Sequence, residues 1–250
     1  LPIKAAMEVK KRYADRIHFE VGVQPLQGVL DPASFAQYAE ACELADYCGG
    51  LPSRDRPTPE KHLDVILSLA KKLGKPVDVH IDQENNPLEN ETELLAEKTI
   101  EHGMQGRVFG VHAISLSAKE DREQDRIIEK VKEADLGIII CPSAALSMKQ
   151  LPMTGPLHNS IAPFVKLRDA GVRCYLGVDN VHDLFMPMVD GDIWTECRML
   201  MEATRFYDID SVAEWACAKP ITAKAGGVGD ATFAGGAEDA APAKKRAAGV

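Results

Sequence analysis

The 250-residue chain carries a formal net charge of −9, and 45% of its residues are hydrophobic. An acidic chain with no run of Lys or Arg outside its last few residues is not expected to bind nucleic acid. No window approaches the roughly 18 consecutive apolar residues of a membrane span, so no membrane partner is expected. The length and the apolar content favour one large domain over several small ones.

The cysteines and the first residues indicate the cellular setting. Six cysteines show neither CxxC spacing nor a secreted disulfide framework, at positions 42, 48, 141, 174, 197 and 217. We therefore expect buried, reduced thiols in a cytoplasmic protein. Because the chain starts at Leu1 and not at a signal peptide or an initiator Met, the sequence predicts that residues upstream of it are missing.

Short β-rich runs alternate with helical patterns along most of the chain. A first helix is expected over residues 1–13. The β-rich runs start about 30 residues apart, near Ile17, Ala45, Pro76, Gly106, Leu136 and Val172. This period is typical of parallel strands that are joined by crossover helices.

Two of the helices between these runs have a clear apolar face. Residues 59–73 repeat apolar side chains at helical spacing, and Gly74 is expected to end this helix. Residues 118–134 form a highly charged pattern whose inner stripe is Ile127, Ile128 and Val131. Both patterns predict helices that pack one face against a sheet.

A third helix is predicted over residues 91–102 from its end signals. Asn90 and Glu93 have the spacing of a capping box, in which each side chain bonds a backbone N–H of the first turn. Gly103 is expected to stop the helix.

The strand count defines the expected fold class. A closed (β/α)8 barrel needs eight parallel strands, and the pattern supplies six. We expect an incomplete (β/α)8 TIM barrel over residues 1–218, with about six parallel strands, helices outside, and two strands missing on the N-terminal side. Residues 219–250 are rich in Ala and Gly, which predicts a disordered tail.

Residues suited to metal chemistry follow three of the predicted strands. In such barrels the functional groups lie at the C-terminal ends of the strands. His80 and His112 follow the third and fourth strands, and Asp179 follows the sixth. Imidazole and carboxylate groups suit a Zn²⁺ or Fe²⁺ site that activates water. The alternative is two hydrogen-bonded structural histidines and a helix-capping aspartate. The remaining histidines do not lie at strand ends and are expected to be ordinary: His18, His62, His102 and His158. His182 follows Asp179 closely and could line a pocket.

The stretch from Phe19 to about Trp194 resembles the cytosine deaminase branch of the amidohydrolase superfamily. The matching segments occur in consistent order, at residues 25–30, 45–52, 79–82, 106–112 and 177–181. The resemblance implies one divalent metal, Zn or Fe, with His80 and Asp179 as ligands. It also implies that Asp179 accepts a proton from the attacking water, and that His112 orients this water or the tetrahedral intermediate.

The chain departs from the family pattern at three places. The His-x-His pair of the family's first strand is absent, so we expect the metal to be weakly held. The family's proton-shuttling glutamate is Gln83 here, followed by Glu84, and an amide cannot act as a general acid or base near neutral pH. The expected substrate-binding glutamine is Leu26, with Gln27 one residue on.

These residues give two sets of candidates. The catalytic candidates are Asp179, His112, Gln83 and Glu84, of which Gln83 is expected to hydrogen-bond the substrate. The substrate-binding candidates are Gln27, Leu26, Asn180 and Phe185.

Two classes of function follow from these observations. The first is a metal-dependent hydrolase of a non-peptide C–N bond that deaminates a pyrimidine-like or related nitrogen heterocycle. Within this class, the alternative is an amine-releasing hydrolase of a triazine or a cyclic amide. The second class is a catalytically silent barrel fragment that binds a ligand or a subunit. The expected partner is a small nitrogen heterocycle. The sequence leaves open whether the chain also forms a homo-oligomer.

Overall fold

The computed structural model describes residues 2–148 and 159–217, in which six strands form one parallel sheet. The strands pair in sequence order, which confirms the predicted parallel α/β arrangement. They are β1 Gly22–Val23, β2 Tyr47–Gly50, β3 Val77–Ile81, β4 Val108–His112, β5 Gly137–Ile140 and β6 Arg173–Leu176.

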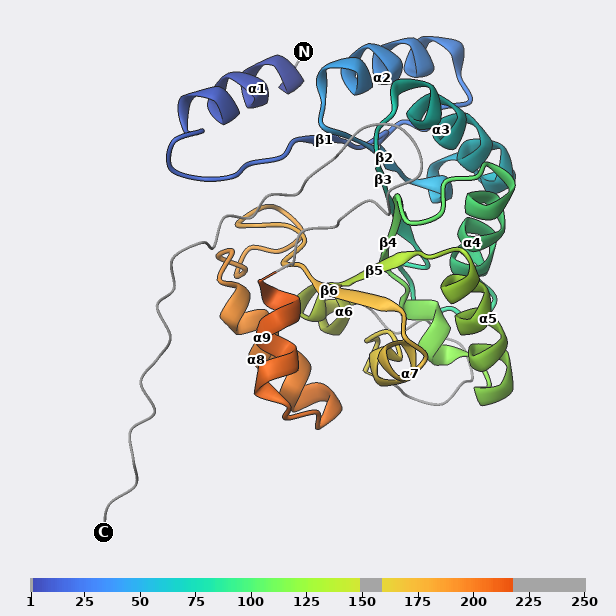
Figure 1. Ribbon diagram of the computed structural model, residues 1–250, viewed down its shortest axis with the longest axis vertical. Coiled ribbons are helices and arrows are strands. Elements are labelled where there is room, and N and C mark those ends of the chain that lie inside the picture. Colours follow the sequence, from blue (N-terminus) through green and yellow to red (C-terminus); the bar gives the residue numbers. More distant parts are fainter. Residues whose placement is uncertain (1, 149–158, 218–250) are drawn as a thin grey trace.

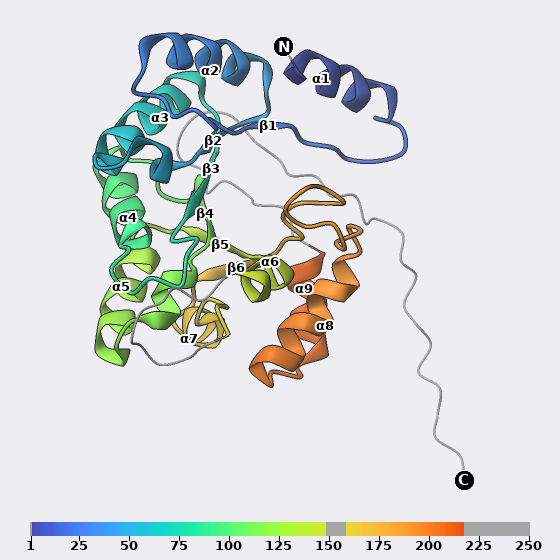
Figure 2. The same ribbon diagram turned by 180° about the vertical axis from the view of Figure 1, so that it is seen from behind.

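Helices cover the outer face of the curved sheet. Figures 1 and 2 show α2 to α5 stacked along one side of it, with α8 and α9 beyond β6. The helices are α1 Pro2–Arg12, α2 Pro32–Leu44, α3 Pro59–Leu73, α4 Glu91–Glu101, α5 Asp121–Glu133, α6 Pro142–Ser147, α7 Phe164–Asp169, α8 Ile193–Thr204 and α9 Ile209–Ala216, with short 3-10 helices η1 Pro52–Asp55 and η2 Ile114–Ala118.

The first strand is much shorter than the β-rich run that predicted it. Only Gly22 and Val23 pair with β2, whereas Ile17 and Phe19 are exposed. An edge strand has a neighbour on one side only, so less of the run gains ladder hydrogen bonds.

Strand β3 shows how the core and the site share one sheet. Its outward side chains, Val77, Val79 and Ile81, are fully buried in the main hydrophobic core. Successive side chains of a strand point to opposite faces, so Asp78 and His80 lie on the inner face. The packing that fixes the core residues therefore also fixes these two polar residues.

The two helices with clear apolar faces form, α3 with its predicted bounds and α5 within the predicted range 118–134 but starting only at Asp121, because the 3-10 helix η2 extends to Ala118. Helix α3 ends before Gly74, whose φ of 70° lies in the left-handed region. In α5 the predicted stripe of Ile127, Ile128 and Val131 is buried.

The predicted capping box of α4 is wrong. The Asn90 side chain makes no cap hydrogen bond and accepts one from Lys119 Nζ, while Glu93 pairs with Arg126 and Lys130 on α5. The cap comes from Asp82, which follows β3. Its buried carboxylate accepts hydrogen bonds from the backbone N–H groups of Glu91 and Thr92, at 2.9 and 3.0 Å.

Other expectations have mixed outcomes. Five cysteines are free and buried as predicted, at positions 42, 48, 141, 174 and 197, whereas Cys217 is exposed. Among the described residues, no helix is long and apolar enough to cross a membrane. The predicted boundary at residue 218, the predicted tail 219–250 and His158 lie outside the described residues.

Candidate metal centre

A cavity of about 970 Å³ lies over the inner face and the C-terminal ends of the strands. Each of the six strands, or the segment that follows it, contributes to the lining, through Gln24, Leu51, Gln83, His112, Cys141 and Asp179. This is the position at which parallel α/β folds place their functional groups.

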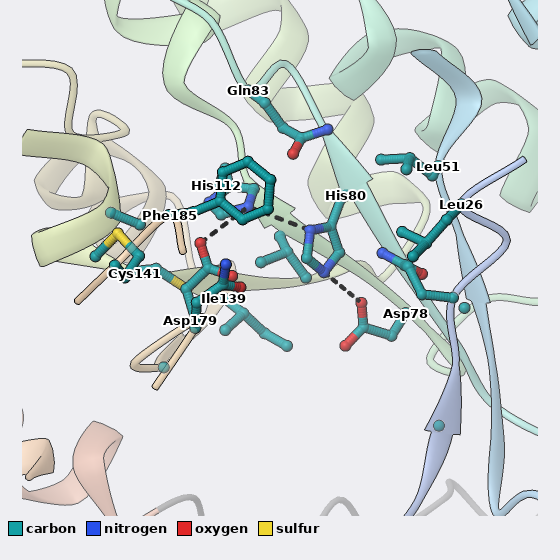
Figure 3. A pocket seen from close by; sticks show the side chains of 18 of the residues that line it. Leu26, Leu51, Asp78, His80, Gln83, His112, Ile139, Cys141, Asp179 and Phe185 are labelled. Atoms are coloured by element: carbon teal, nitrogen blue, oxygen red, sulfur yellow. Dashed lines mark hydrogen bonds and ion pairs between the residues drawn. The ribbon is translucent and has the colours of Figure 1, made fainter. Parts of the chain in front are cut away.

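His80, His112 and Asp179 converge in this cavity. Their potential ligand atoms all lie within 4.8 Å of one another. Nε2 of His112 is 3.3 Å from Nδ1 of His80 and 3.9 Å from Oδ2 of Asp179, as Figure 3 shows. The expectation that these three side chains meet at one end of the sheet is confirmed.

Two of these residues have an unusual backbone conformation. His112 and Asp179 have φ angles of 79° and 61°, in the left-handed region that residues with a Cβ rarely adopt. Each such residue costs on the order of 1–2 kcal/mol, which the surrounding structure must offset. Strain of this kind gathers at functional sites, where the backbone turns a side chain toward a ligand.

Burial keeps both imidazoles neutral. It lowers the pKa of His112 to about 4. Burial and the neighbouring His112 lower the pKa of His80 to about 4 as well, against the opposing effect of Asp179. A neutral imidazole has one ring nitrogen with a free lone pair, which is the form that binds a metal. Burial also raises the pKa of Asp179, while His80 lowers it.

Asp78 is a site residue that the sequence reasoning missed. Its Oδ1 lies 3.9 Å from Nε2 of His80, and it lines the same cavity. Burial and the charge of Asp179 raise the pKa of Asp78 to about 7. The strand period could have identified it, because residues two apart on a strand share a face.

The donor set fits one divalent cation. Ligand atoms that bind one zinc ion through bonds of ~2 Å lie up to ~4 Å apart, so small side-chain adjustments would bring these three together. A mixed imidazole and carboxylate set suits zinc or iron(II).

The other predicted site residues differ in position. Gln83 points toward the two histidines in Figure 3, and the exposed Glu84 also lines the cavity. The left-handed φ of Asp82, 47°, supplies the bend that Glu84 needs to reach it. Three of the expected substrate-binding residues line the cavity, namely Leu26, Asn180 and Phe185. The fourth, Gln27, is exposed outside it. His182 is exposed outside it too.

Comparisons with known proteins agree with this geometry. The model of the Amidohydrolase family matches residues 29–227. An uncharacterized protein of Haemophilus influenzae is 38% identical over 164 residues, which cover 64% of this chain and 59% of that protein. N-isopropylammelide isopropyl amidohydrolase of Pseudomonas sp. strain ADP is 27% identical over 194 residues, which cover 76% of this chain and 45% of the relative.

A solved structure has the same fold. The crystal structure of 5-methylcytosine deaminase from Klebsiella pneumoniae, liganded with phosphonocytosine, superposes with a TM-score of 0.79 at 21% identity. The superposition covers 85% of this chain and 54% of the deaminase. The chain thus spans about half the length of the proteins it matches.

Proposed function

The chain belongs to the amidohydrolase family, and we propose that it forms the metal centre of a hydrolase that cleaves a non-peptide C–N bond in a nitrogen heterocycle. The observation that carries this proposal is the convergence of His80, His112 and Asp179 on one cavity at the strand ends. The relatives named for an ammelide and for 5-methylcytosine support a small heterocycle as the substrate.

The proposal gives each of the three residues a role at the metal centre. His80 and Asp179 hold the cation, which when bound supplies Lewis acidity. The carboxylate of Asp179 accepts a proton from the attacking water and returns it to the departing amine. His112 orients the water, because its neutral ring can donate or accept a hydrogen bond at Nε2.

Residues around the metal centre would select the substrate. Gln83 offers an amide that can donate to a ring nitrogen or a carbonyl oxygen and accept from a ring N–H. Leu26 and Phe185 supply apolar surface for a flat ring, and Asn180 adds a further amide to the cavity lining.

Deamination of a pyrimidine-like ring is the first candidate reaction. The amide at Gln83 supports a second one, the release of an alkylamine from a triazine or a cyclic amide, because a glutamate shuttle is absent at that position. The third candidate is the silent barrel fragment, which would retain the cavity without turnover.

Metal content and turnover together test the proposal. The protein is purified from medium supplemented with zinc or iron, its metal is quantified, and ammonia or amine release is measured with cytosine, 5-methylcytosine and N-isopropylammelide. We expect Asp179→Asn and His80→Ala to lower both metal content and turnover. His102→Ala is the control, because His102 bonds Asp64 outside the cavity. A chain with neither metal nor turnover supports the silent fragment.

A further inference from the structure

His62 forms a buried polar pair with Asp55 beside the cavity. The His62 side chain is fully buried on α3, and its Nδ1 lies 2.6 Å from Oδ2 of Asp55. On the other side of the ring, Nε2 accepts a hydrogen bond of 2.9 Å from the backbone N–H of Leu51. An acceptor at Nε2 requires the proton of a neutral ring to be on Nδ1, where it is donated to Asp55.

Asp55 extends this contact to a second segment. The same Oδ2 accepts a hydrogen bond of 2.8 Å from the backbone N–H of Val29. The carboxylate lies so close to Gly28 that a Cβ at that residue would clash with it, and the φ of Gly28 is 76°. Gly28 therefore allows both the turn and the close approach of the carboxylate.

The pair thus joins the two segments that follow β1 and β2. The first segment carries Leu26, and the second carries Leu51 and Arg54, all of which line the cavity. Figure 3 places Leu26 and Leu51 on the side of the cavity away from Cys141 and Asp179. These segments form the cavity rim on the β1–β2 side.

We propose that His62 and Asp55 are positioning residues that hold this rim in the shape that receives the substrate. The inference rests on the proposed function, because it concerns the same cavity. His62 thereby affects the binding of the substrate. It takes no part in metal binding or in the chemical step, since neither His62 nor Asp55 lines the cavity.

Stability alone does not distinguish this role from simple packing. Replacement of a buried polar pair by apolar side chains is often neutral or stabilising. The discriminating measurements are therefore the state of the imidazole, the protection of the two rim amides, and the division of kinetic effects between KM and kcat.

The first experiment uses NMR on the unmodified chain. We expect the ¹⁵N signals of the His62 ring to show a protonated Nδ1 and an unprotonated Nε2. A ring protonated at Nε2 would overturn the proposal, because it could not accept the hydrogen bond from Leu51. This measurement requires no variant and no ligand.

The second experiment compares amide exchange in His62→Leu and His102→Leu. His102 also bonds a carboxylate, at 3.0 Å from Asp64, but the other hydrogen-bond partners of this pair, Lys71 and Lys98, do not belong to segments that line the cavity. We expect exchange at Leu51 to rise about fivefold in His62→Leu, since the lost hydrogen bond contributes roughly 1 kcal/mol, and exchange at Val29 to rise because Asp55 loses its partner. It should be unchanged in the control. Unchanged exchange at Leu51 in His62→Leu contradicts the proposal.

A conservative variant covers the case in which His62→Leu fails to fold. In His62→Gln the side-chain oxygen can still accept from the N–H of Leu51, so we expect Leu51 to remain protected. Loss of this protection in a folded His62→Gln protein would show that the amide is protected by packing alone.

The third experiment measures kinetics with 5-methylcytosine and N-isopropylammelide. In His62→Leu we expect KM to rise about tenfold, with kcat and metal content nearly unchanged. The reason is that a displaced rim weakens the binding of the substrate and of the transition state equally. A fall in kcat at constant KM would overturn the positioning role. If the wild-type protein converts neither compound, the proposed function fails, whereas the ring and amide measurements still decide whether the pair holds the rim.

Discussion

The rings of His80 and His112 meet edge to face, with centroids 5.0 Å apart and an angle of 78° between the ring planes. Burial keeps both rings uncharged at neutral pH, so their nitrogens face each other without charge repulsion. The hydrogen bond between Nδ1 of His80 and Nε2 of His112 requires one ring nitrogen to donate its proton and the other to accept it. A divalent cation would instead be held by a lone pair of His80 and by the carboxylate of Asp179, which would leave His112 free to orient a water molecule.

We predict that the 250-residue chain binds zinc weakly. Zinc sites usually have three or four protein ligands, and only His80 and Asp179 are proposed as direct ligands here. Zinc should therefore be lost to a mild competing chelator, and Asp179→Asn should weaken binding at least ~10-fold, the lower end of what removal of a supporting residue costs. Chelator competition followed by metal analysis measures both. Stoichiometric zinc that resists the chelator would show that His112 or Asp78, which both lie beside His80, completes the site.

The assignment of proton transfer predicts a rise in rate for one variant and little change for a variant of the adjacent residue. In an active form of the protein, Gln83→Glu should raise the rate of ammonia release from an aminopyrimidine, because it restores a general acid–base group. Glu84→Ala should change the rate little, since Glu84 is exposed although it lines the cavity.

General acid–base assistance contributes roughly 10²–10⁴-fold to a rate, so steady-state assays would detect a real shuttle. A loss of this size in Glu84→Ala, at unchanged metal content, would transfer the role to Glu84.

Asp82 should contribute more to stability than an exposed helix cap. Its carboxylate bonds the N–H groups of Glu91 and Thr92 and the hydroxyl of Thr92, all of which are buried. We expect Asp82→Ala to lower the free energy of unfolding by about 2 kcal/mol or more, because buried donors lose their acceptor. Urea denaturation measures this loss.

Two variants provide the controls for Asp82. Asp31→Ala removes the exposed cap of α2 and should lower the free energy of unfolding by less than Asp82→Ala does. Asp82→Asn retains an acceptor and tolerates the left-handed backbone, so it should lose less than Asp82→Ala. Equal losses in Asp82→Ala and Asp31→Ala would contradict the importance of burial.

The ion pairs of Glu93 predict a pH-dependent contribution to stability. Hydrogen bonds from Arg126 and Lys130 lower the pKa of Glu93 from 4.5 to about 2. A carboxylate whose pKa is lower in the folded state stabilises the fold above its unfolded-state pKa, and this contribution disappears as the pH falls through the folded-state pKa.

The melting temperature of Glu93→Gln should therefore be below that of the wild type near pH 7. The difference should shrink as the pH falls from about 4.5 towards 2. Thermal unfolding monitored by circular dichroism measures it, with Glu8→Gln as the control because Glu8 is an exposed residue of α1. A difference that stays constant over this range would show that the charge of Glu93 does not contribute.

Much of the architecture was predictable because it depends on local patterns. The 30-residue period predicts six parallel strands in order, and the apolar spacing of residues 59–73 matches α3 at both ends. The convergence of His80, His112 and Asp179 followed from one topological rule, that parallel strands present their C-terminal ends at the same edge. Periodicity and strand ends are properties of short stretches of sequence, so the sequence by itself determined these features.

The tertiary structure decided the contacts between residues far apart in the chain. A local motif predicted that Asn90 caps α4, but Asp82 does so, because the end of β3 brings its carboxylate to the helix N-terminus. His62 appeared ordinary in sequence until the fold placed it between Asp55 and the N–H of Leu51. Such partners depend on how strands and helices pack, and burial then makes their hydrogen bonds costly to leave unmade, so only the packed molecule determined which residues shape the cavity.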